Sequence, residues 1–214
     1  MTITFRSFSK LLFILLLSIQ FANAMANTGK AFSIKGTAVI NESELRAGDT
    51  IKEGDIIKTG ANSSVKIIMK DRTVLDINEN TRFEITKYSY SKEAPAKNKS
   101  SFRLLKGAFR YISGLIAKHR HQNVQISAGT TTIGIRGSFD TISFDGTTII
   151  VKVSIGTATF TFANGETVTI ATGKTGIFDI STGQSSVELT SSPDPVAQAA
   201  KDIAQNPDDA ANVA

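Results

Sequence analysis

The segment "TTTIGIRGSFDTI" (Thr130–Ile142) alternates apolar and polar residues like a β-strand, yet it contains two glycines and an arginine. A glycine inside a strand weakens it and usually marks a bulge, a bend or the close approach of another backbone. We therefore expect Gly134 and Gly137 to let a neighbouring strand approach closely. We expect Arg136 to donate hydrogen bonds to carbonyls at a turn or to a carboxylate, with contact to a ligand as the alternative.

The composition of the whole chain is that of a β-protein. Its 214 residues include 13 phenylalanines but no tryptophan and no cysteine, and valine, isoleucine and threonine dominate the middle of the chain. β-branched and aromatic residues favour strands. Because there is no cysteine, disulfides, thiol catalysis and zinc–thiolate sites are excluded.

Short strand-like runs separated by turn residues fill the chain from 27 to 180 and predict one all-β domain. We expect its core over 36–144 and a β-hairpin extension over 145–180. The extension is predicted from two strong hairpin turn signals, Asp145-Gly146 and Asn164-Gly165.

Two segments interrupt the strand pattern. Residues 91–101 contain proline, serine and lysine and predict a loop. The next segment has apolar residues close to helical spacing, but it also contains Gly114 and β-branched residues. We expect a strand through Tyr111 and then a bent or short helical connection through Ala117.

The two ends of the chain have different compositions. Residues 1–24 combine two basic residues with the apolar run "LLFILLLSI" and predict a signal peptide, cleaved after Ala24 or Ala26. An uncleaved anchor is the alternative, although the run is shorter than the roughly 20 residues that span a bilayer. We therefore expect a periplasmic or secreted protein with no membrane span after signal removal. Residues 181–214 predict a flexible acidic tail with a short helix opened by Pro195.

Positive charge is concentrated in the middle of the chain. Residues 87–121 contain nine lysines and arginines against Glu93, a net charge of +8 with neutral histidines. Such a stretch either binds an anionic partner or forms a solvated edge that prevents aggregation. The candidate partner-binding residues of this basic stretch are Lys97, Lys99, Arg103, Lys106 and Arg110.

We find no pattern that predicts catalysis. His119 and His121 stand two residues apart and could share a metal in an extended segment, but Lys118 and Arg120 flank them. The G-x-S-x-G motif of serine hydrolases is absent, and Ile135 stands where a phosphate-binding loop needs lysine. We therefore expect no cofactor, no metal and no catalytic residue.

Three blocks in order resemble the FecR protein domain of bacterial envelope proteins. They are the pairs Gly48-Asp49 and Gly54-Asp55 ending at Gly60, the hairpin from Val65 to Ile77, and G-I-R-G at Gly134, Ile135, Arg136 and Gly137. This chain departs from the family pattern at Asp71-Arg72, where Asp-Gly is usual, and at Ser138, where threonine is usual.

The resemblance implies a winding, two-layered, solenoid-like or sandwich-like β-architecture. In that architecture each Gly-Asp pair is expected to supply a positive φ and an Asx-type hydrogen bond at a tight corner. The glycines of the G-I-R-G segment (134–137) then belong to the backbone architecture.

The resemblance also bears on function. The name-giving member of the family passes a signal from an outer-membrane receptor to a cytoplasmic sigma factor, through a membrane-spanning helix. Because this chain has a signal peptide instead, we do not expect sigma regulation. We expect a non-catalytic binding module for an envelope or secreted protein, or for an anionic cell-wall or outer-membrane polymer, and no nucleic-acid partner.

The alternatives are a polysaccharide-active enzyme on a β-solenoid and a cell-wall-polymer-binding protein. Such an enzyme needs clustered acids and aromatic sugar platforms. Residues 124–180 contain no tryptophan, and their four acids are scattered, at Asp140, Asp145, Glu166 and Asp179. This composition disfavours the enzyme.

Overall fold

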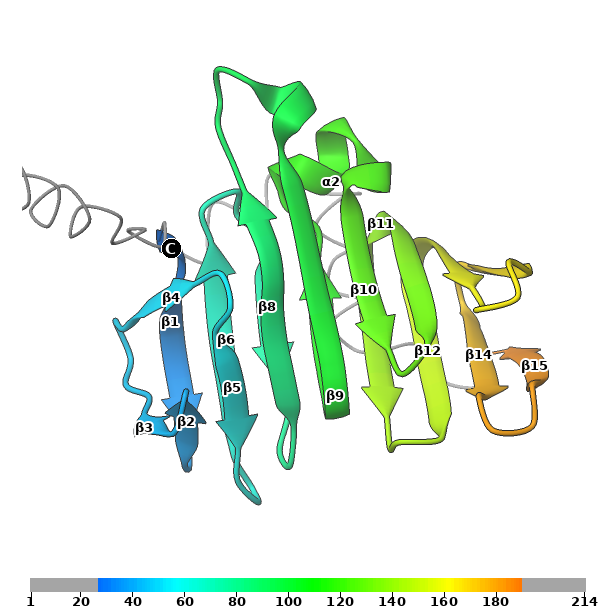
Figure 1. Ribbon diagram of the computed structural model, residues 1–214, viewed down its shortest axis with the longest axis horizontal. Coiled ribbons are helices and arrows are strands. Elements are labelled where there is room, and N and C mark those ends of the chain that lie inside the picture. Colours follow the sequence, from blue (N-terminus) through cyan, green and yellow to red (C-terminus); the bar gives the residue numbers. More distant parts are fainter. Residues whose placement is uncertain (1–26, 190–214) are drawn as a thin grey trace, which may run out of the picture.

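The computed structural model describes residues 27–189, and the strands among them are hydrogen-bonded into one 15-stranded sheet (Figure 1). The predicted all-β class is confirmed. The strands are β1 (Asn27–Lys35), β2 (Ala38–Ile40), β3 (Ser43–Glu44), β4 (Thr50–Lys52), β5 (Ile56–Thr59), β6 (Ser64–Met69), β7 (Val74–Ile77), β8 (Arg82–Ser89), β9 (Lys99–Ile112), β10 (Val124–Ala128), β11 (Thr131–Phe144), β12 (Thr148–Thr161), β13 (Thr167–Ala171), β14 (Lys174–Asp179) and β15 (Gln184–Leu189).

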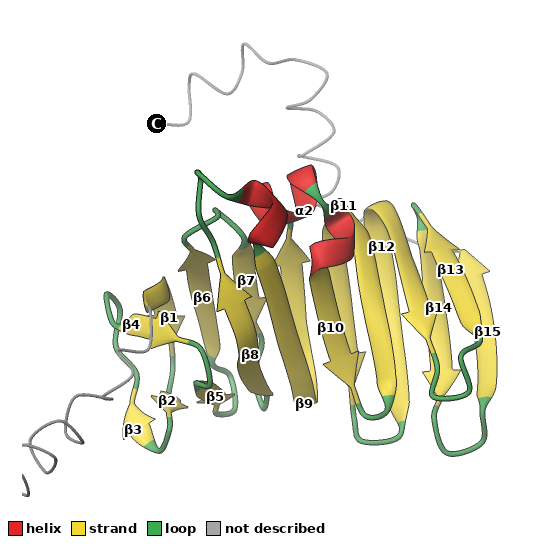
Figure 2. Cartoon of the chain, turned by 45° about the horizontal axis from the view of Figure 1, so that its top comes forward, coloured by secondary structure: helices red, strands yellow, loops and turns green. Residues whose placement is uncertain are grey.

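Helical structure among the described residues is limited to three short pieces at one end of the sheet (Figure 2). They are the 3-10 turn η2 (Pro95–Lys97), the helix α2 (Leu115–His119) and the 3-10 turn η3 (His121–Asn123). Within residues 27–189, no helix combines the length and the hydropathy needed to cross a bilayer.

The sheet consists of two rows of strands that share β9, β11 and β12, each 14 residues long. The first half of β9 pairs with β8 and β10, whereas its second half pairs with β7 and β11. The first row runs β3-β2-β5-β8-β9-β10-β11-β12-β13. The second row runs β4-β1-β6-β7-β9-β11-β12-β14-β15.

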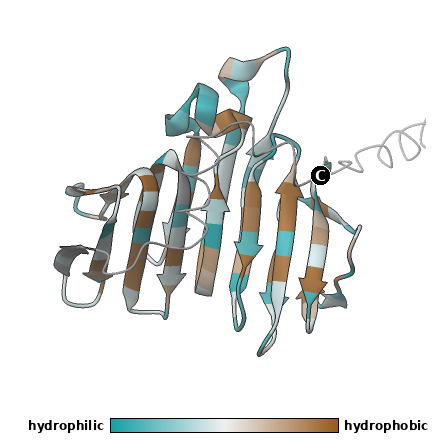
Figure 3. Cartoon of the chain, turned by 180° about the vertical axis from the view of Figure 1, so that it is seen from behind, coloured by the Kyte–Doolittle hydropathy of each residue, from teal (hydrophilic) through white to brown (hydrophobic). Residues whose placement is uncertain are grey.

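The two rows face each other across an aromatic core. Phe83 of the first row lies 4.7 Å from Phe109 of the second between ring centroids, and Phe160 of the first row stacks on Phe178 of the second at 4.0 Å. All four rings are fully buried. Apolar and polar residues alternate along many of the strands, as Figure 3 shows, because successive side chains point into and out of the core.

β11 and β12 pass from one row to the other at a pair of glycines. Gly137 and Gly156 are partners in register, and the pairing shifts immediately after Gly137. A Cβ atom on Gly137 would lie 2.3 Å from the carbonyl oxygen of Ile155 and 2.6 Å from the Cα atom of Gly156. Real Cβ atoms do not approach backbone so closely, so the predicted close approach of a neighbouring strand is confirmed at Gly137.

Most of the predicted connections are confirmed. β9 ends at Ile112 and is followed by the short helix α2, and both predicted hairpins form, between β11 and β12 and between β12 and β13. The loop predicted over 91–101 is shorter, because β9 already begins at Lys99 and pairs there with Ser89.

The end of the described chain differs from the expected tail. β15 occupies 184–189 and pairs in register with β14, so the sheet continues past residue 180. The turn before it ends at Gly183, whose φ is +72°. The predicted signal peptide over 1–24 and the helix expected from Pro195 lie outside the described residues.

Candidate functional site

The two Gly-Asp pairs form two copies of the same corner. Gly48 and Gly54 have φ values of +93° and +87°, as predicted, in the left-handed region that glycine adopts without strain. Each aspartate accepts a backbone N–H from three residues earlier: Arg46 to Asp49 at 2.8 Å, and Lys52 to Asp55 at 2.7 Å. The predicted side-chain bond therefore exists, and it closes the turn backward along the chain.

Each corner is fixed to a different row. The Gly48 N–H donates to the carbonyl oxygen of Ala31 on β1, and the Gly54 N–H donates to that of Ile85 on β8. Asp55 is buried and also accepts the Asn41 side-chain amide at 2.7 Å. The Gly-Asp pairs thus join the two rows at this edge and have a structural role.

At Asp71-Arg72, where the family pattern usually has Asp-Gly, the chain still forms a turn with positive φ. Arg72 has a φ of +69°, which a non-glycine residue seldom adopts. Asp71 is fully buried, and its carboxylate accepts hydrogen bonds from Tyr88, Thr73 and the Ile116 N–H. These donors hold the turn of the β6–β7 hairpin to β8 and to α2. The Tyr88 hydroxyl is itself buried, and burial, followed by the nearby Asp71 charge, raises its pKa above the usual value.

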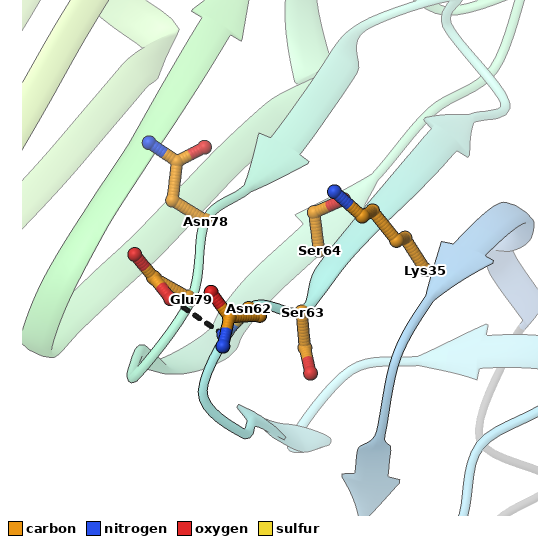
Figure 4. Close-up of a pocket in the computed structure, with 6 residues that line it drawn as sticks. All are labelled: Lys35, Asn62, Ser63, Ser64, Asn78 and Glu79. Atoms are coloured by element: carbon orange, nitrogen blue, oxygen red, sulfur yellow. Dashed lines mark hydrogen bonds between the residues drawn. The ribbon is translucent and has the colours of Figure 1, made fainter.

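A polar hollow of about 300 Å³ lies at the β5–β6 and β7–β8 turns (Figure 4). Its lining residues are Lys35, Asn62, Ser63, Ser64, Asn78 and Glu79. Figure 4 shows Glu79 turned toward the backbone of Asn62, whose N–H donates to its carboxylate at 2.5 Å. Ser63 accepts the Thr37 N–H and donates to the Ala61 carbonyl. The side chains of Glu79 and Ser63 are therefore used in hydrogen bonds of the turns, and a structural role explains them. Gly60 precedes it, and a Cβ there would lie 2.4 Å from the Thr37 hydroxyl oxygen.

The prediction for Gly134 is wrong. Its φ is not positive, and a Cβ atom built on it would meet only the Thr159 carbonyl oxygen, at an ordinary contact distance of 3.8 Å. The fold-over of the strands lies three residues later, at Gly137, so no backbone presses against Gly134. A side chain would fit here, and steric need does not explain the glycine.

The architectural prediction for Arg136 is also wrong, because its side chain is exposed. The four ion pairs found among the described residues do not include it. Arg136 instead lines a groove of about 420 Å³ on the outer face of the first row. The groove residues are His121, Gln122, Gly134, Ile135, Arg136, Thr157, Thr159 and Thr169.

The basic stretch does not form a single surface. Lys97, in η2, and Lys99 and Arg103, on the first row, are exposed, but Arg103 is paired with Glu84 at 3.1 Å. Arg110 follows the register shift in β9 and lies opposite Asp76 of β7, in the second row. It sits between the buried Phe109 and Tyr111, so it faces away from the core on the opposite side of the molecule.

Lys106, the fifth predicted residue, lies at that register shift and is exposed opposite Arg82. The sequence could not show that these basic residues divide between the two rows, because β9 is one uninterrupted strand where it passes from one row to the other. The residues that remain together are Lys97 and Lys99, which we call the lysine edge.

The two histidines belong to different helical pieces. His119 is the last residue of the helix and His121 the first of η3, and both are exposed. Within residues 27–189, no group of three or more metal-binding side chains comes together. His121 lines the Arg136 groove, a position that the sequence did not indicate.

Comparison with known proteins identifies a family. The family model described as FecR protein matches residues 55–159, a span that includes Asp55, the β6–β7 hairpin and the G-I-R-G segment. No curated protein matches the chain.

Two solved structures are similar in fold, and both are crystal structures of a proposed anti-sigma factor from Parabacteroides distasonis. The first aligns with a TM-score of 0.51 and 12% identity over 71% of this chain and 64% of the other. The second aligns with a TM-score of 0.50 and 11% identity over 63% and 59%. This chain therefore spans less than two thirds of either one, and at such identities the likeness concerns the fold. The family identification rests on the matched model alone, which recognises a FecR protein domain over residues 55–159 of this chain.

Proposed function

We propose that the chain is a non-catalytic interaction module of the bacterial cell envelope, which takes part in signalling by binding a protein partner. The FecR domain supports an envelope signalling role, and the two similar folds belong to a protein named for sigma-factor regulation. Protein contacts are the ordinary means of action of such modules, so a protein partner is favoured over the enzyme and over the cell-wall-polymer-binding alternative.

We also propose the domain organisation that the sequence predicts. Residues 1–24 act as a signal peptide and residues 27–180 form the FecR-like domain. Residues 181–214 follow as the tail, except that β15 within them still adds a strand to the domain's sheet. The two facing rows of strands are the two layers of the winding architecture, and the strands after residue 144 are its hairpin extension. The product is periplasmic or secreted.

The lysine edge is the observation that carries a partner-binding role. Lys97 ends η2 and Lys99 begins β9, both are exposed, and no described acidic residue forms an ion pair with either. Lys87, in contrast, is neutralised by Glu53 at 2.8 Å. Unneutralised charge on an exposed face attracts a partner of opposite sign and steers its approach. The partner is therefore expected to present an acidic surface.

Cross-linking in intact cells tests this function. The variant Lys97→Glu/Lys99→Glu should capture about tenfold less of the protein partner than the wild type, because attraction becomes repulsion. The matched control is Lys35→Glu/Lys52→Glu, two exposed lysines on β1 and β4. Raising the salt concentration should weaken capture by the wild type and by the control.

Two results would contradict the proposal. Equal capture by both variants would mean that the lysine edge is a solvated edge. Capture of a polysaccharide in place of a protein would establish the cell-wall-polymer-binding alternative.

A further inference from the structure

The Arg136 groove contains a glycine that the fold does not need. A strand-interior glycine reduces stability relative to alanine, and it often marks a place where a ligand approaches closely. Gly134 has an ordinary φ and room for a side chain, so neither strain nor packing explains it. Because Gly134 has no side chain, the floor of the groove is open there. This open floor lies between Thr159 and Gln125, which are the register partners of Gly134.

The groove is polar and positively charged. Its side chains offer a guanidinium from Arg136, an imidazole from His121, an amide from Gln122 and hydroxyls from three threonines. None of the lining residues is acidic. Lys118 in α2 and Arg120, the residue just before His121, are exposed and add further positive charge. The planar fork of arginine donates two parallel hydrogen bonds to a carboxylate, so the groove suits an anionic ligand.

The threonines give the groove its second property. Thr159 and Thr169 are partners in register on β12 and β13, with their hydroxyl oxygens 3.3 Å apart. The Thr157 hydroxyl lies 3.4 Å from the Arg136 carbonyl oxygen. Hydroxyls both donate and accept hydrogen bonds, so this wall can satisfy a ligand that presents several hydroxyls on one face.

The site is poorly suited to a peptide. Peptides that bind to sheets add a strand at an exposed edge or insert apolar side chains into pockets. Here β11 is paired on both sides over 132–134 and β12 over 157–161, and Ile135, the one apolar lining residue, is 1% exposed. A sugar has neither requirement. The volume of about 420 Å³ lies within the roughly 300–1,000 Å³ usual for small-molecule sites.

We propose that the Arg136 groove binds a sugar unit that carries a carboxylate. Arg136 holds the carboxylate, the three threonines and Gln122 bind the hydroxyls, and the bare backbone of Gly134 lets the ring lie close to the sheet. This site goes beyond the proposed protein partner and does not involve the lysine edge.

Calorimetric titration of the purified full chain with trigalacturonate tests the site. The wild type should bind saturably, and Arg136→Gln and Gly134→Val should bind at least about tenfold more weakly, because one loses the guanidinium and the other fills the floor. Neither variant should lower the midpoint of thermal unfolding. The matched control is Arg82→Gln, an exposed arginine in the same row outside the groove, which should bind as the wild type does.

Three comparison probes define the ligand class. The neutral galactose trimer, galactose 6-phosphate and an oligoglutamate peptide should each bind more weakly than trigalacturonate. Tighter binding of the sugar phosphate would overturn the carboxylate assignment, and equal or tighter binding of oligoglutamate would overturn the sugar. The site itself is wrong if the wild type fails to bind trigalacturonate, or if Arg136→Gln and Arg82→Gln bind it equally. Because the assay uses purified protein and no lysine-edge variant, its failure is distinct from failure of partner capture in cells.

Discussion

Asp140 is a carboxylate that the fold buries without a partner. It is completely inaccessible, and neither of its side-chain oxygens has a hydrogen-bond partner among the residues that the structure describes. It lies three residues after Gly137 and opposite Tyr111 in the register of β9 and β11. Burial raises the pKa of Asp140 to about 8, because a charged carboxylate loses its hydration there. Burial also raises the pKa of Tyr111, with a further contribution from the charge of Asp71.

The buried Asp140 makes stability depend on pH. The unfolded chain releases this proton near a pKa of 3.8, whereas the folded chain keeps it until about 8. The unfolded state therefore binds fewer protons between these values, and the free energy of unfolding falls as pH rises, by up to on the order of 5 kcal/mol. Asp140→Asn should remove this fall.

Urea unfolding midpoints between about pH 5 and pH 8 measure the effect. The matched control is Asp145→Asn, since backbone N–H groups, that of Thr148 foremost, lower the pKa of Asp145 and keep it ionised over this range. A slope that persists in Asp140→Asn and equals that of the control would show that another group is responsible.

At the scale of elements, the fold depends on strands that change rows. β11 and β12 bend together where Gly137 and Gly156 meet, and β9 changes its inward face at the register shift near Lys106. These bends let one strand contribute its first half to one face of the core and its second half to the other. They also explain why basic residues close in the sequence end on opposite sides of the molecule.

Gly137→Val should destabilise the bend strongly. The new Cβ would lie within 2.6 Å of two backbone atoms, Ile155 O and Gly156 Cα, which cannot rotate away. We expect a loss of about 2–4 kcal/mol in the free energy of unfolding, typical of severe overpacking. Gly134→Val, with its nearest contact at 3.8 Å, should not lower stability, and the loss of a strand glycine should raise it by up to about 1 kcal/mol. Chemical unfolding of the two variants measures both values, and equal losses would contradict the assigned positions of the two glycines.

The sequence predicts local features here far better than long-range ones. Turn residues and alternation gave the hairpins, the Gly-Asp corners and the short helix, because each depends on residues close in the chain. The place where a strand changes rows depends on contacts between distant strands, so the sequence did not tell Gly134 from Gly137. For the same reason the exposure of Arg136 and its place beside His121 could not be predicted, although both residues stand out in the sequence.

At the scale of the whole molecule, the residues that the structure describes surround one core, with a row of strands on each side. β1 begins at Asn27, which pairs with Lys52 of β4. The strands added beyond residue 144 lengthen the same core through Phe160 and Phe178. No separate second core is formed by the described residues.

The exported form should begin at Met25 or Asn27 and leave the cell envelope on osmotic shock, because the predicted signal peptide is removed on export. Either start leaves β1 complete. N-terminal sequencing of the released protein checks this outcome. A protein that begins at Met1 and sediments with membranes would instead be held by an uncleaved anchor.

The continuity of β9, β11 and β12 between the rows has a mechanical consequence. The two rows cannot separate as rigid units, because each of these three strands belongs to both rows and joins them covalently. A load on the C-terminal end first meets β15, which six register pairs hold to β14, and only later the twelve pairs between β11 and β12. Under tension the strands should therefore detach one after another from that end. The force needed should rise when the longer pairing between β11 and β12 is reached.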